Sequence, residues 1–138
     1  MTEHGFDLPP KAPPEVVARR DAQADEVCRA LARAGIPVYR AGFGGDVEER
    51  AGAEVHVDAL VVGGVLVEWN TATELTEAAV NLLAGGVDPS ALPDAIRHFE
   101  TVHAGMRRAL LEILVSAGFP AEQADPHTYG AAILVRDL

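Results

Sequence analysis

The 138-residue sequence has one cysteine, one lysine, few aromatic residues and no long apolar run. The single thiol, Cys28, cannot form an intramolecular disulfide and is typical of a reducing compartment. The longest apolar run, residues 59–67, includes two glycines and is far shorter than a bilayer-spanning helix requires. The sequence also opens without a basic and apolar leader. These absences predict a cytoplasmic protein that does not enter a membrane.

Basic charge is also scarce, because 11 basic residues stand against 21 acidic ones and the formal net charge is −10. Proteins that bind nucleic acid present clustered Lys and Arg. This chain offers two short pairs, Arg19-Arg20 and Arg107-Arg108, so we expect no nucleic-acid partner. No nucleophile elbow, Cys-x-x-Cys or His-Glu-x-x-His motif occurs, and residues 42–45 lack the lysine of a phosphate loop. We therefore expect no cofactor.

The pattern of apolar residues predicts one α+β domain over residues 14–138. Residues 1–13 carry three prolines and little periodic apolar content, which predicts a flexible N-terminal arm. The order α-β-β-β-α-α-β suggests a sheet of about four strands with the helices mainly on one face. The last strand is apolar on both faces, so it should be central. Helices are predicted at 14–34, 71–84 and 92–117, and strands at 37–43, 54–62, 65–70 and 129–136.

The second and third predicted strands should form a hairpin around Gly63-Gly64. A three-residue loop, with one glycine in the left-handed conformation, places Val61 opposite Val65. This register gathers the valines and Trp69 on one face, whereas a two-residue turn would mix apolar and polar residues, so we prefer it. The opposite face then carries the polar residues Glu54, His56, Asp58, Glu68 and Asn70.

In that register Asp58 faces Glu68 across the sheet and His56 faces Asn70. Two facing carboxylates repel, so the pKa of one of them should rise unless a cation or a hydrogen-bond donor lies between them. Such a pair suits acid/base catalysis, with His56 as a proton shuttle, or a divalent-metal site. Glu54 and Asn70 are then candidates for substrate binding. A solvated strand face with ordinary polar residues is the simpler interpretation.

A histidine also interrupts the apolar stripe of the long helix. His103 is either a core histidine or a substrate-binding residue in a pocket. His98 lies five residues earlier, about 140° around the helix axis at 3.6 residues per turn. The two histidines therefore cannot form a metal-binding pair on one helix face.

Asp58 and the triplet Glu68-Trp69-Asn70 lie on successive predicted strands. The pattern resembles restriction-endonuclease-like nucleases, which place an Asp and a Glu-x-Lys on adjacent strands of an α-β-β-β-α-β core. The resemblance covers about residues 14–84 and implies a similar core. However, Asn70 replaces the lysine, no Pro-Asp begins the motif, and the charge is wrong for DNA. We therefore expect no nuclease activity and assign no family.

Three hypotheses follow for the function. The first is a small acidic accessory or binding protein for a protein, peptide or small-molecule partner. It would form a homodimer through the long helix, or through Leu60, Val62 and Leu66 on the open side of the sheet. The second is a small acid/base enzyme of metabolite or natural-peptide tailoring that uses His56, Asp58 and Glu68. The third is a divalent-metal-binding domain with the same three residues as ligands.

Overall fold

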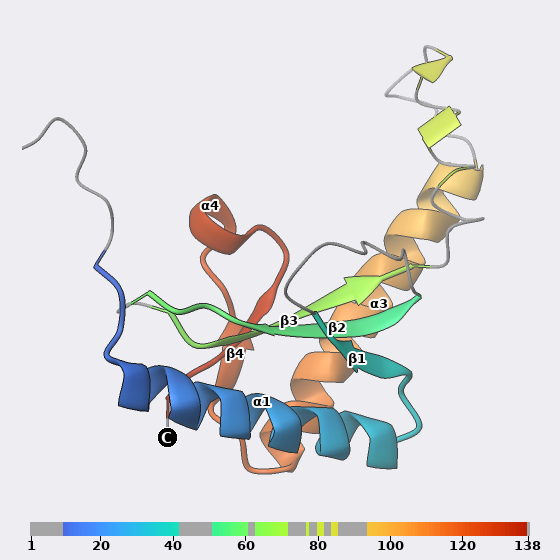
Figure 1. Ribbon diagram of the computed structural model, residues 1–138. Helices are drawn as coiled ribbons and strands as arrows, with labels where there is room; N and C mark the ends of the chain where they lie inside the picture. The colour runs from blue at the N-terminus through green and yellow to red at the C-terminus, as the bar shows by residue number, and fades with distance from the viewer. Residues whose placement is uncertain are drawn as a thin grey trace, which may run out of the picture.

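The computed structural model describes residues 10–41, 51–60, 63–71 and 94–137, and positions 77, 80, 81, 84 and 85. The predicted α+β class is confirmed (Figure 1). In chain order the named elements are α1 (Pro14–Arg33), β1 (Val38–Arg40), β2 (Gly52–Val57), β3 (Val65–Asn70), α3 (Asp94–Ser116), β4 (Ala121–Gln123), α4 (Pro126–Tyr129) and β5 (Ile133–Val135).

The sheet has five strands rather than the predicted four, in the order β1-β2-β3-β5-β4. β1 runs parallel to β2, and the other neighbours are antiparallel. β5 lies between β3 and β4, as its apolar sequence predicted. The strand that we missed, β4, has the sequence AEQ. It is too short to show alternation and has no β-branched residue, so it lacks the usual strand signals.

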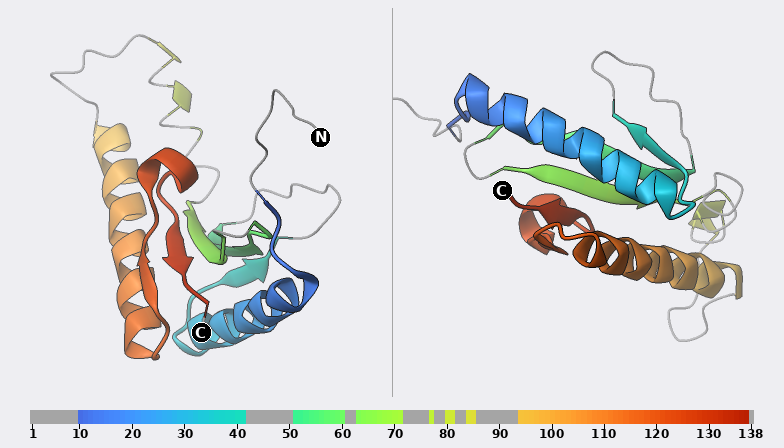
Figure 2. Two further views of the ribbon diagram at one scale, coloured as in Figure 1. Left: turned by 90° about the vertical axis from the view of Figure 1, so that its left-hand side faces the viewer. Right: turned by 90° about the horizontal axis from the view of Figure 1, so that it is seen from below.

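Both long helices cover the same face of the sheet, which confirms the predicted arrangement. Seen from below, α1 and α3 lie side by side across the strands (Figure 2). Pro14 begins α1 at a position where its missing N–H costs no hydrogen bond. The buried stripes of the two helices meet the inward residues of β2, β3 and β5. The fully buried core is made of Ala24, Val27, Leu31, Ala53, Val55, Val65, Val67, Leu110, Leu114, Ile133 and Val135.

The hairpin register that we predicted is wrong, although the assignment of its faces is right. Val57, not Val61, lies opposite Val65, and Glu54, not Asp58, lies opposite Glu68. The difference is four residues. Because side chains alternate with a period of two, an even shift keeps every side chain on its face and changes only its partner.

The connection between the paired residues Val57 and Val65 is longer than we predicted, which explains the shift. Neither Gly63 nor Gly64 has a positive φ, so the left-handed turn that we expected is not formed. Both glycines are needed for close packing instead. A Cβ at Gly63 would lie 2.5 Å from the carbonyl oxygen of Asp58, and one at Gly64 would lie 2.8 Å from that of Val135.

A buried arginine, which sequence reasoning did not single out, holds this loop against α1. The Arg20 side chain is 2% exposed. Its Nη1 donates to the carbonyl oxygens of Asp58 and Leu60 at 2.7 and 2.6 Å. Its Nε and Nη2 donate to the two carboxylate oxygens of Asp137 at 2.8 and 3.0 Å. Arg20 therefore ties the first helix to both the hairpin loop and the C-terminal segment.

The segment before α1 also contacts this loop. Ala12 donates its backbone N–H to the carbonyl oxygen of Ala59 at 2.8 Å, and Lys11 forms a bridge with Leu60. Residues 1–9 of the predicted arm lie outside the described residues. Within the described part of the chain, no helix is long and apolar enough to cross a bilayer.

Candidate functional site

The face of the sheet that faces away from α1 and α3 carries a row of polar side chains, which we call the open face. The registers place Tyr39 of β1 opposite Glu54 of β2, and Glu54 opposite Glu68 of β3. Paired residues share a face of the sheet, so these three side chains lie in one row across three strands. His56 belongs to the same face in the next row, and Asn70 lies two residues beyond Glu68 on β3. All are partly buried.

Asn70 organises one end of this row. Its Nδ2 donates to Oε2 of Glu54 at 3.1 Å and to the hydroxyl oxygen of Tyr39. These hydrogen bonds orient the Glu54 carboxylate. Glu68, by contrast, has no hydrogen bond or ion pair with any residue that the structure describes. The row thus holds one oriented carboxylate directly opposite one that is unpaired.

The predicted catalytic residues His56, Asp58 and Glu68 do not form the constellation that we expected. Asp58 follows the end of β2, and its Oδ1 accepts the backbone N–H of Leu60 at 2.9 Å in a local turn. His56 lies opposite Leu66 rather than Asn70. The predicted pairing of Asp58 with Glu68 is wrong because the register differs by four residues. The arrangement that resembled the nucleases is lost with it.

The same shift removes the proposed metal ligands. Within the described ranges, no group of three or more His, Cys, Asp or Glu side chains could hold a metal ion. The substrate-binding candidates Glu54 and Asn70 do lie together. His103 does not join them: it is partly buried on α3 and stacks on Phe99, with 6.1 Å between the ring centroids.

Part of the sheet surface that we expected to be exposed is covered. Leu66 is only 3% exposed, because it packs against Ala124, Ala132 and Leu134. The chain between β4 and β5, which includes α4, passes over this end of the sheet (Figure 1). Leu66 therefore cannot contribute to the exposed apolar interface that we predicted. Val62 lies outside the described residues.

No family model, no curated protein and no solved structure matches this chain. The chemistry of the open face therefore rests on its own geometry. The amide of Asn70 contacts the Glu54 carboxylate and the Tyr39 phenol, and Glu68 lies at the register position opposite Glu54. In this group of side chains the acceptor oxygens outnumber the donors. Such a surface is suited to a cationic, hydrogen-bond-donating group.

Proposed function

We propose that this chain is a small acidic binding protein whose open face holds an arginine side chain of a protein or peptide partner. The observation that carries the proposal is the register that puts Glu54 directly opposite Glu68. Like charges in such cross-strand positions destabilise a sheet. A cation bound between them would turn this repulsion into attraction.

The geometry favours arginine over lysine. A guanidinium group is a planar fork that can donate to two carboxylates at once, whereas an ammonium group is a compact point charge. Asn70 already holds the Glu54 carboxylate in place, which lowers the entropy lost on binding. The Tyr39 ring, in the same row, offers a face on which a guanidinium could stack.

The overall charge supports a basic partner as well. A formal net charge of −10 attracts cationic segments over long range and speeds their association at low salt. A homodimer through the open face is less compatible with this proposal, because twofold pairing would bring two acidic rows together. The acid/base alternative loses its support, since Asp58 does not face Glu68.

The proposal is tested by titrating the ¹⁵N-labelled protein with a short, end-blocked peptide that contains two arginines. A matched peptide with citrulline in place of arginine keeps the shape, but it removes the charge and replaces one donating amino group by an accepting carbonyl oxygen. We expect saturable shifts of the Glu54, Glu68 and Asn70 amides with the arginine peptide only. Glu68→Gln should weaken binding by about tenfold or more, as expected for a hydrogen bond between charged groups.

Glu112→Gln is the control variant. Glu112 is exposed on α3, and its substitution changes the net charge by the same amount away from the open face. Binding by this variant should match that of the wild type apart from a small screening effect. Equal weakening in Glu68→Gln and Glu112→Gln, or equal shifts with the citrulline peptide, would overturn the proposal.

A further inference from the structure

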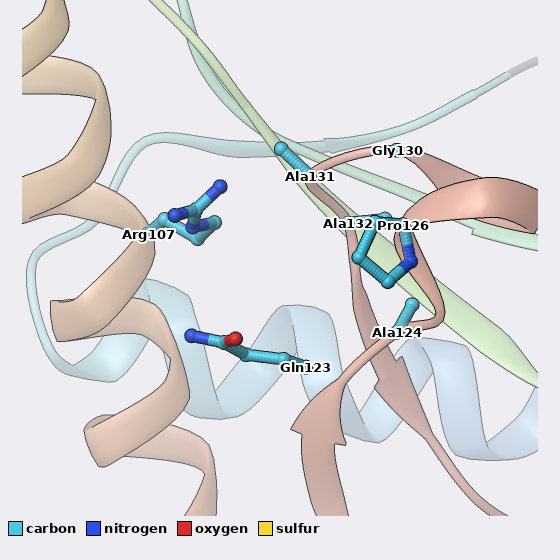
Figure 3. Close-up of a pocket in the computed structure, with 7 residues that line it drawn as sticks. All are labelled: Arg107, Gln123, Ala124, Pro126, Gly130, Ala131 and Ala132. Carbon is cyan, nitrogen blue, oxygen red and sulfur yellow. The ribbon is translucent and has the colours of Figure 1, made fainter.

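A pocket of about 260 Å³ lies between α3 and the chain that connects β4 to β5. The Arg107 side chain extends into it from α3, and the Gln123 side chain extends from β4 (Figure 3). The rest of the wall is built from small or rigid residues: Ala124, Pro126, Gly130, Ala131 and Ala132. Gly130 has a φ of 63°, a conformation that other residues seldom adopt. The pocket therefore combines one cationic group, one amide and a wall of small residues, and it is open to solvent on the side of Pro126, Gly130 and Ala131.

Arg107 differs from the other arginines of the described chain. The two other arginines that are buried or partly buried both pair with carboxylates: Arg20 with Asp137, and Arg40 with Asp21 and Asp25. Arg107 is partly buried, yet it has no ion pair or side-chain hydrogen bond with any described residue. The remaining basic residues without such partners in the described part are exposed: Lys11, Arg19, Arg29, Arg33 and Arg108.

The sequence around Arg107 explains why it is unpaired. Positions three and four residues away on a helix are the ones that can form ion pairs. At Arg107 these positions hold His103, Ala104, Leu110 and Leu111, so none supplies a carboxylate. In a chain with 21 acidic residues, a partly buried arginine without a carboxylate is available for a carboxylate from outside.

We propose that this pocket binds a small molecule with a single carboxylate on a short aliphatic body. The guanidinium of Arg107 would hold the carboxylate in a two-pronged contact, with the Gln123 amide as a further donor. The Ala and Pro wall would cover the aliphatic part. A volume below the roughly 300 Å³ at which pockets for drug-sized ligands begin limits that part to a few carbon atoms. The formal net charge of −10 opposes a doubly charged phosphate more than a singly charged carboxylate.

Butyrate is a suitable probe, with butyramide as its neutral counterpart and inorganic phosphate as the competing oxyanion. We expect butyrate to cause saturable shifts in the Arg107 Nε, the Gln123 side-chain amide and the backbone amides of residues 130–132. Butyramide and phosphate should cause much smaller shifts at equal concentration. None of the residues that line this pocket belongs to the row of Tyr39, Glu54 and Glu68, so its test does not depend on the arginine peptide.

The variants distinguish the contribution of the guanidinium group to butyrate binding from the effects of net charge and of folding. Arg107→Gln should weaken butyrate binding by at least about tenfold, the loss expected for hydrogen bonds to a charged group. Arg107→Lys keeps the charge and should bind with intermediate affinity, whereas Arg108→Gln, the exposed neighbour, should bind as the wild type does. Equal shifts with butyramide, stronger binding of phosphate, or equal losses in Arg107→Gln and Arg108→Gln would each overturn the proposal. So would the absence of saturable shifts in the folded wild type.

Discussion

The two faces of the sheet differ in the side chains that they carry and in how these side chains interact. On the covered face, apolar side chains of both helices and three strands interlock, and the core there is completely buried. On the open face, polar side chains meet in one row, and two carboxylates lie directly opposite each other. The first face stabilises the fold, whereas the second keeps an unfavourable contact. Because stability alone would favour removing that contact, the difference between the faces is the basis of the proposal that the open face binds a cationic partner.

A substitution on the covered face should have the largest effect on the free energy of unfolding. Leu110 is fully buried in the core between α3 and the sheet, so Leu110→Ala removes apolar contacts and leaves a cavity. We expect the free energy of unfolding to fall by about 3–5 kcal/mol. Urea denaturation measures this loss, and Val115→Ala, at an exposed position of the same helix, is the control. Similar losses in the two variants would show that α3 does not pack as described.

The covered face could be predicted from sequence because alternation reports directly on burial. Val55 and Val67 were assigned to the core face, and Glu54 and Glu68 to the other face, by their period of two. Which residues lie opposite each other could not be predicted in this way. The register depends on the fit of Gly63 against Asp58 and on Arg20, whose carbonyl partners lie 38 and 40 residues away in the chain.

The same difference between faces and partners applies to the candidate site. Glu54, His56, Glu68 and Asn70 were correctly placed on one face, but the partners within that face were not. Tyr39 was missed because the parallel pairing of β1 with β2 leaves no local signal in the sequence. Arg107 could have been noticed from its lack of a carboxylate one helical turn away, although only the fold shows the pocket beside it.

Replacing Arg20, the buried arginine that joins α1 to the hairpin loop, should lower the free energy of unfolding less than replacing a core leucine does. Arg20→Met keeps an apolar stem of similar length but leaves the carbonyl groups of Asp58 and Leu60 without their donor. We expect a loss of about 2–3 kcal/mol, since each unsatisfied buried polar group costs about 1–3 kcal/mol. Arg19→Met, at an exposed neighbouring position, should be nearly neutral. Wild-type stability in Arg20→Met would contradict this role.

The ion pair of Arg20 with Asp137 should contribute still less to the free energy of unfolding, and its contribution should depend on pH. The hydrogen bonds from Arg20 are the main cause that lowers the pKa of Asp137 below its ordinary value of 3.8. A lowered pKa in the folded state contributes stability that is complete above pH 3.8 and is lost as pH falls through the folded-state pKa. Because the Asp137 side chain is 47% exposed, we expect no more than about 1 kcal/mol from the pair.

Asp137→Asn tests this dependence. The variant should be less stable than the wild type at neutral pH, and the difference should shrink below about pH 4 as the wild-type carboxylate gains its proton. Urea denaturation at a series of pH values measures both curves. A difference that stays constant down to pH 2 would show that the charge of Asp137 is not responsible.

The most direct test of the contrast between the two faces is urea denaturation of the wild type and Glu68→Gln, each with and without the arginine peptide. Without peptide, we predict that Glu68→Gln is more stable than the wild type, by up to about 1 kcal/mol, because the repulsion from Glu54 is relieved. With saturating peptide, the wild type should gain more stability than the variant, since only ligand bound to the folded state stabilises it. If Glu68→Gln is instead less stable without peptide, or if the peptide stabilises both proteins equally, the open face is not the binding face described here.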